Sequence, residues 1–241
     1  MPVHHLVGPT TSAWQLKTTP AKTTVKIAVS DAQGAAVDRF DKIHTKPLHL
    51  IAIDVDSLDV VAHAHPTLKN GKFSGSLPSL QGAYALFAEY DPQGALPQTM
   101  DRYSVGTPGQ SAPGWDFQTK KKTVNGVTVE LLAANLMPGM AMPVRVRLTD
   151  ANGKPYTPKT WLAAKGHMLA AQEKAPELYH FHPASGASSG GHNGHGSTQP
   201  AKKGEIEFAA EVANSGPHRL FLQFVKKGET TPTTVSFDVN V

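Results

Sequence analysis

Two stretches of the chain combine a histidine in a strand-like run with a following His-x-His-Pro sequence. In a β-strand, residues two apart project from the same face, so each His-x-His offers two imidazoles that point the same way. The upstream histidine can supply a third. The two candidate sets are His49, His63 and His65 in the first half and His167, His180 and His182 in the second.

The spacing within each set allows the imidazoles to converge. If residues 49–54 and 60–65 form an antiparallel hairpin, His49 lies opposite or diagonal to His63 and His65. A turn near residues 173–174 would likewise place His167 opposite His180. Three imidazoles on adjacent strands suit a borderline metal, copper first and zinc next, with one coordination position left open.

The sequence around the two sets also repeats. Residues 25–34 match residues 144–153, because both are an alternating strand followed by an Asp-Ala-Gln/Asn-Gly turn. Residues 82–90 match residues 216–224 in the same order. This order predicts an internal duplication of one β-rich domain. A duplicated domain inherits packing histidines as readily as ligands, so the repeat alone does not decide their role.

The local patterns predict an all-β fold. Short alternating runs are punctuated by Gly, Pro, Asn and Asp, and no long 3.6-residue apolar period argues for helix. We therefore expect two tandem immunoglobulin-like antiparallel β-sandwich domains related by duplication. Their expected bounds are residues 1–106, a Pro/Gly/Ser linker at 107–116, and residues 117–241 with a Gly/Ser/His-rich insertion at 184–200.

Composition limits the chemistry. The 241 residues include no cysteine, which excludes disulfides, thiolate metal sites, iron-sulfur clusters and cysteine nucleophiles. Any metal must use nitrogen, oxygen or thioether ligands. The net charge of +4 is modest, and Lys120 to Lys122 are more typical of a solvated strand start than of a nucleic-acid footprint, so we expect no nucleic-acid partner.

The expected location is the periplasm or the exterior of the cell. A histidine-rich protein without thiols suits a compartment that lacks a reducing pool. No apolar run reaches membrane-spanning length, and the start of the sequence, Met1 to His5, lacks the apolar core of a signal peptide. We therefore expect a mature or trimmed chain with no transmembrane segment.

Several residues outside the two sets are accessory candidates. The insertion could return imidazoles to the second site, and a methionine cluster offers soft sulfur that favours Cu(I), although methionine is also an ordinary core filler. One further histidine stands where the first half has Tyr84, and could be a fourth ligand or a supporting partner. His44, in contrast, has Leu162 at its place in the second half. The accessory candidates are His192, His195, Met137, Met140, Met142 and His218.

The succession of motifs resembles exported bacterial β-sandwich proteins described as YtkA-like or heavy-metal-binding. The shared elements are an Asp-x-x-Gly turn, a Leu-His or Gly-His strand, His-x-His-Pro, and Gly-x-Tyr-x-Leu-Phe. In the first half they are residues 31–34, 48–49, 63–66 and 82–87, and in the second half 150–153, 166–167, 180–183 and 216–221. The resemblance implies an immunoglobulin-like sandwich and metal binding, without implying a reaction. His218 and the insertion depart from the pattern and leave the ligand set of the second half open.

Three functions follow from these observations. The favoured one is an extracytoplasmic metal-binding protein that stores, delivers or confers resistance to copper or zinc, with a metal-delivery or efflux protein as a conceivable partner. A metalloenzyme with an open coordination position, as in carbonic anhydrases, is less favoured because no carboxylate is obviously placed as a base. The third is a structural or interaction module in which the histidines pack the end of each sandwich, with ring nitrogens that diverge.

Overall fold

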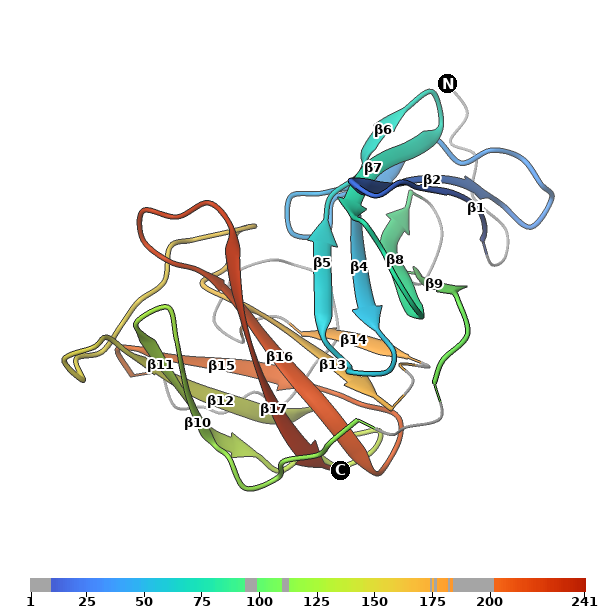
Figure 1. The fold of residues 1–241 in the computed structure, drawn as a ribbon. Coiled ribbons are helices and arrows are strands. Elements are labelled where there is room, and N and C mark those ends of the chain that lie inside the picture. Colours follow the sequence, from blue (N-terminus) through green and yellow to red (C-terminus); the bar gives the residue numbers. More distant parts are fainter. Residues whose placement is uncertain are drawn as a thin grey trace. The chain divides into compact units, whose positions relative to one another are not determined.

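The structure is a computed structural model that describes residues 10–93, 99–109, 113–173, 175, 177–181, 183 and 202–241. The chain divides into two compact units, Met1–Ala112 and Pro113–Val241, and this division falls within residues 107–116. Strands and loops make up all of the described residues, and every strand pairing is antiparallel, so the expected all-β class is confirmed (Figure 1).

The first unit contains two antiparallel sheets. One has the order β1-β2-β7-β6, and the other has the order β3-β8-β4-β5 with β9 also paired to β8. The strands are β1 Thr11–Thr18, β2 Lys22–Ser30, β3 Phe40–Asp41, β4 Leu48–Asp54, β5 Val60–Ala64, β6 Thr67–Lys69, β7 Lys72–Pro78, β8 Tyr84–Pro92 and β9 Thr99–Val105.

The second unit also contains two sheets, with the orders β10-β11-β12-β15 and β14-β13-β16-β17. The strands are β10 Lys121–Val124, β11 Val127–Ala134, β12 Met142–Thr149, β13 His167–Gln172, β14 Leu178–Phe181, β15 Glu205–Ala210, β16 Pro217–Val225 and β17 Pro232–Asn240. The strand order β14-β13-β16-β17 is the same as β5-β4-β8-β9 of the first unit. This shared order accords with the sequence repeat, and the duplication itself stays a prediction.

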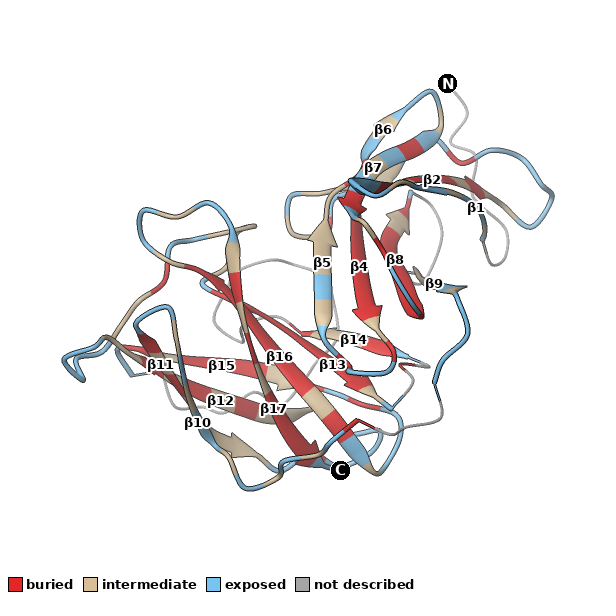
Figure 2. Ribbon diagram, viewed as in Figure 1, coloured by how far each residue is buried: buried red, intermediate tan, exposed pale blue. Residues whose placement is uncertain are grey.

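Each unit buries its core between its two sheets, which makes it a sandwich (Figure 2). In the first unit, Val25, Ile27 and Phe73 from one sheet pack in the same cluster as Leu50 and Leu86 from the other. Alternate residues of these strands face this core, as the period of a β-strand requires. His49 of β4 therefore lies on the other face of this sheet, away from the core.

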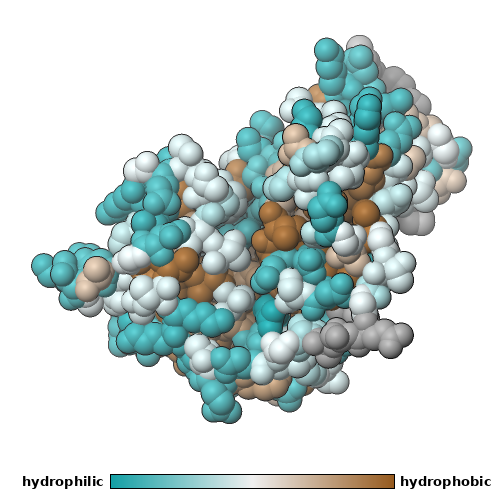
Figure 3. All heavy atoms as spheres, viewed as in Figure 1, coloured by the Kyte–Doolittle hydropathy of each residue, from teal (hydrophilic) through white to brown (hydrophobic). Residues whose placement is uncertain are grey.

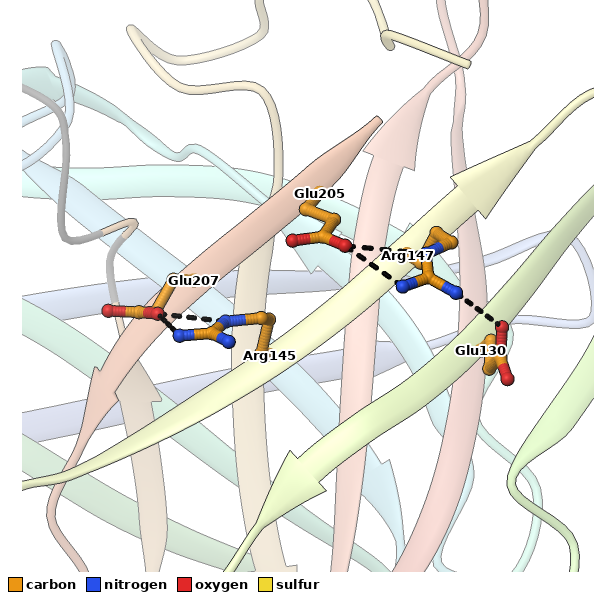
Figure 4. A network of polar contacts seen from close by, with 5 residues as sticks. All are labelled: Glu130, Arg145, Arg147, Glu205 and Glu207. Atoms are coloured by element: carbon orange, nitrogen blue, oxygen red, sulfur yellow. Dashed lines mark hydrogen bonds and ion pairs between the residues drawn. The ribbon is translucent and has the colours of Figure 1, made fainter. Parts of the chain in front are cut away.

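The outward face of the β12 sheet carries an ion-pair network (Figure 4). Arg145 on β12 donates to the carboxylate of Glu207 on β15, at 3.0 Å from Nε and 2.5 Å from Nη2. Two residues along, Arg147 binds Glu205 at 3.1 Å and Glu130 at 3.5 Å. The arginines alternate with buried Val144 and Val146, so the strand is apolar on one side and charged on the other.

Hydrophilic and neutral residues cover most of the face drawn in Figure 3. Among the described residues, the exposed large hydrophobic side chains are those of Val61, Tyr103, Met137 and Met140. Within the described ranges, no helix is long and apolar enough to cross a membrane.

Candidate metal centre

His49 lies on the face of β4 that points away from the core of the first unit. Its neighbours Leu48 and Leu50 belong to the core cluster, so alternation turns His49 to the other side. The imidazole is nevertheless fully buried, as are Ile51 and Ile53 on the same face. His49 is therefore a desolvated histidine at a fixed position in a central strand.

The β4–β5 hairpin brings the His-x-His pair to this face. In its register, Ile51 pairs with His63 and Leu50 pairs with Ala64, which sets His63 diagonal to His49. His65 follows directly after the end of β5. The turn is held by the Asp54 carboxylate, which accepts backbone N–H groups of Asp56 and Ser57 at 2.9 Å each. The hairpin therefore has the diagonal geometry predicted from the sequence.

The three imidazoles of the first unit converge. The His49 Nδ1 and His63 Nε2 atoms are 2.9 Å apart, and the His65 ring centroid is 4.8 Å from that of His49 and 5.0 Å from that of His63. Each ring offers a nitrogen, and these three nitrogens all lie within 4.8 Å of one another. Two nitrogens that each lie about 2 Å from a tetrahedral metal are about 3.3 Å apart, so metal binding requires the close pair to open slightly and the longer separations to shorten.

A backbone carbonyl fixes which nitrogen of His49 faces the group. His49 Nε2 lies 2.8 Å from the carbonyl oxygen of Ile43, which can only accept, so Nε2 carries the hydrogen. The lone pair of neutral His49 is then on Nδ1, toward His63. Donation of the second ring N–H to a backbone carbonyl is the usual support for a metal-binding histidine. The same pair is also a satisfactory His–His hydrogen bond without metal, with His63 Nε2–H as donor.

His65 remains neutral at mildly acidic pH. Burial, with a smaller effect from the charge of Lys46, lowers the pKa of His65 from 6.5 to about 4. Protons therefore do not compete with a metal for His65 above about pH 4. Protonation of His65 therefore contributes little to any loss of metal affinity between pH 7 and 5.

The same shift predicts a pH dependence of the metal-free fold. Between pH 6.5 and about 4, the unfolded chain protonates His65 and the folded chain does not, so stability falls as the pH falls through this window. Because His65 is partly exposed, we expect a loss of about 1 kcal/mol rather than the full value of the shift. Urea unfolding in EDTA at pH 7 and pH 5 measures it. His65→Gln should lose less stability than the wild type over this interval, and equal losses would contradict the assignment.

Two more side chains of the first unit stand beside the three histidines. His44 has a left-handed backbone, with φ 45°, and its ring centroid is 5.9 Å from that of His49. Burial lowers the pKa of His44, and the charge of Glu89 acts in the opposite direction. Glu89, on β8, pairs with His49 across the β4–β8 ladder and is only 2% exposed. Sequence reasoning missed Glu89, although an acidic residue inside the otherwise apolar run of residues 84–90 was a usable signal.

The second unit repeats the central pair of histidines. His167 Nδ1 lies 3.3 Å from His180 Nε2, and His167 Nε2 lies 3.1 Å from the carbonyl oxygen of Trp161. The β13–β14 register pairs Leu169 with His180, so the diagonal relation is the same as in the first unit. The third predicted ligand, His182, lies outside the described residues.

The structure separates His218 from this pair. His218 alternates on β16 with Leu220 and Leu222, which belong to the core, whereas Gln223 pairs with His167 on the other face. His218 Nδ1–H donates to the carbonyl oxygen of Gly216 at 3.0 Å, and burial lowers the pKa of His218. The expectation of a fourth ligand or supporting partner at His218 is thus wrong, because its side chain points into the sandwich.

The three accessory methionines do not form one group. Met137 and Met140 face each other across a tight turn and are 44% and 51% exposed, whereas Met142 packs against the core of the second unit. The structure therefore does not bring all three thioethers to one point of the surface. His192 and His195 lie outside the described residues, so their reach to the second site stays a prediction.

The second half of the chain matches a known family. Residues 122–241 match the "Domain of unknown function (DUF8832)". The DUF8832 match covers most of β10 and all of β11 to β17, with His167 and His180. It begins after the first unit, so it does not include the three converging histidines. No curated protein matches the chain.

Three solved structures show distant likenesses to this chain. A Parabacteroides merdae β-glucuronidase is 10% identical, with 98% of this chain and 24% of that chain covered and a TM-score of 0.25. Fibronectin(III)-like modules of Clostridium thermocellum CbhA are 12% identical, with 96% and 94% covered and a TM-score of 0.25. A Salmonella alpha-2-macroglobulin mutant is 12% identical, with 95% and 14% covered and a TM-score of 0.24. The chain thus spans about a quarter of the β-glucuronidase, and none of these likenesses bears on function.

Proposed function

We propose that the protein binds a transition-metal ion, copper first and zinc next, through His49, His63 and His65 of the first unit. The observation that carries this proposal is the convergence of three ring nitrogens within 4.8 Å, with His49 held as the Nδ1 donor by the Ile43 carbonyl. Neutral imidazole is a preferred ligand of both metals, and three protein ligands leave a position open for exchange.

The proposal extends to the second unit and to a cellular role. His167 and His180 have the same mutual geometry, and His182 would complete a second site. An open site on an extracytoplasmic protein suits storage, delivery or resistance, with a delivery or efflux protein as the exchange partner. The absence of cysteine and the resemblance to YtkA-like proteins support this placement.

A structural role is the second candidate, because the His49–His63 pair is satisfied by hydrogen bonds without a metal. In that case the histidines hold the hairpin against β4 and bind no ion tightly. The two candidates differ in one measurable quantity, which is affinity for metal at neutral pH.

Equilibrium titration of untagged protein with Cu(II) and with Zn(II), against a chromogenic competitor, tests the proposal. We expect tight binding at pH 7.5 and much weaker binding at pH 5.5. One equivalent per chain would indicate the first unit alone, and two would indicate both. Failure to bind either ion at pH 7.5 removes the proposal and leaves the structural role.

A further inference from the structure

The two units differ in charge at matched positions beside their histidine pairs. Glu89 pairs with His49 on the β4–β8 ladder, and Gln223 pairs with His167 on the β13–β16 ladder. Both side chains are 2% exposed. The first unit therefore buries a carboxylate next to its central histidine, where the second unit buries a neutral amide.

A second difference accompanies the first. The turns before β4 and β13 have the same conformation, since His44 and Leu162 both adopt a positive φ, of 45° and 50°. His44 interacts electrostatically with Glu89, whereas Leu162 has no charge or ligand atom to offer. In the first unit a histidine thus interacts with the carboxylate, and in the second unit a leucine holds the matching position of the turn.

We propose that the buried carboxylate of Glu89 raises the affinity of the first-unit site for divalent cations and makes it the stronger of the two metal sites. This inference rests on the proposed function. Directly opposed residues of antiparallel strands have Cβ atoms about 5 Å apart, so the carboxylate lies close to the His49 imidazole and, through it, to a bound ion. Three neutral imidazoles leave the full charge of the metal uncompensated, and a buried carboxylate offsets part of it with little screening.

One positive charge acts in the opposite direction. Lys46 lies near His65 and contributes to its lowered pKa, whereas Ala164 holds the matching position in the second unit. Lys46 is partly exposed, so water and salt screen its ammonium more than they screen the buried carboxylate. The balance therefore still favours cation binding in the first unit.

The two units provide matched variants for the test. A His180→Ala background silences the second unit, and Glu89→Gln is then added to the first. In the reciprocal background, His63→Ala silences the first unit, and Gln223→Glu is added to the second. The probe is Zn(II) alone at pH 7.5, measured by competition with a chelator. We expect Glu89→Gln to weaken binding about tenfold and Gln223→Glu to strengthen it about tenfold.

Two further readouts separate charge from structure. Glu89→Asp keeps the charge and should retain most of the affinity for Zn(II). Coulomb energy scales with the charge of the ion, so the loss caused by Glu89→Gln, in log Kd, should be about half as large for Ag(I) as for Zn(II). Equal losses for the two ions would show a packing effect and overturn the inference.

The outcomes are distinguishable from failure of the proposed function. Wild-type protein that binds Zn(II) while Glu89→Gln leaves the affinity unchanged overturns the role of Glu89 only. Wild-type protein that binds neither Zn(II) nor Cu(II) at pH 7.5 overturns both, and if it binds only Cu(II), the same comparison of Glu89→Gln with the wild type is made with Cu(II). Circular dichroism checks the fold of each variant, and if Gln223→Glu does not fold, the Glu89→Gln, Glu89→Asp and Ag(I) arms decide the question.

Discussion

Replacing His63 by alanine is expected to weaken Zn(II) binding by the first unit about a thousandfold. The change removes one of three converging imidazoles and takes away the nitrogen that lies 2.9 Å from His49 Nδ1. Loss of a residue that only supports a ligand typically costs ten- to a hundredfold in metal affinity, and loss of a ligand should cost more. His63 is partly exposed on a hairpin strand, so alanine should disturb the sandwich core little.

The matched control for this variant is His180→Ala, which makes the same change at the equivalent position of the second unit. His180→Ala should leave the first-unit affinity unchanged, and the double variant should lose it. Competition titration with Zn(II) at pH 7.5 gives both values. If the double variant still binds one equivalent with wild-type affinity, the ligands lie elsewhere.

The general architecture could be predicted from local sequence patterns. Strands are indicated by alternating apolar residues such as Val25 and Ile27, because side-chain direction in a strand alternates with position. Hairpins are indicated by the Asp-x-x-Gly turns. The same rule placed His63 and His65 on one side of a strand, and the hairpin spacing then brought His49 to them. The residues that make these contacts are close together in the sequence, so local patterns are enough to predict the contacts.

The features that were missed depend on contacts between strands far apart in the sequence. Glu89 lies next to His49 only because β4 pairs with β8, and the two residues are forty positions apart in the sequence. The His49 tautomer is fixed by the backbone carbonyl of Ile43, and a backbone group cannot be recognised from the residue type. The role of His218 was predicted wrongly because its alignment with Tyr84 identified its strand but not the face of the sheet on which its side chain lies. Tyr84 itself belongs to the core cluster, so the matched position points inward in both units.

A metal ion should also stabilise the first unit strongly against heat. An ion that binds only the folded state adds about 4 kcal/mol to the unfolding free energy when its free concentration is a thousand times Kd. For a unit of about 100 residues, each kcal/mol raises Tm by about 4–8 °C, so we expect a rise of about 15 °C or more.

Differential scanning calorimetry of the whole chain can assign this rise to one unit. Each unit has its own buried core, so we expect two unfolding transitions. Zn(II) should raise the transition of the first unit, EDTA should reverse the rise, and His63→Ala should abolish it. The second unit keeps the His167–His180 pair but lacks the buried carboxylate, so its transition should move less. A rise of equal size in both transitions would instead mean that the three imidazoles alone determine the affinity, regardless of whether the neighbouring buried residue is charged.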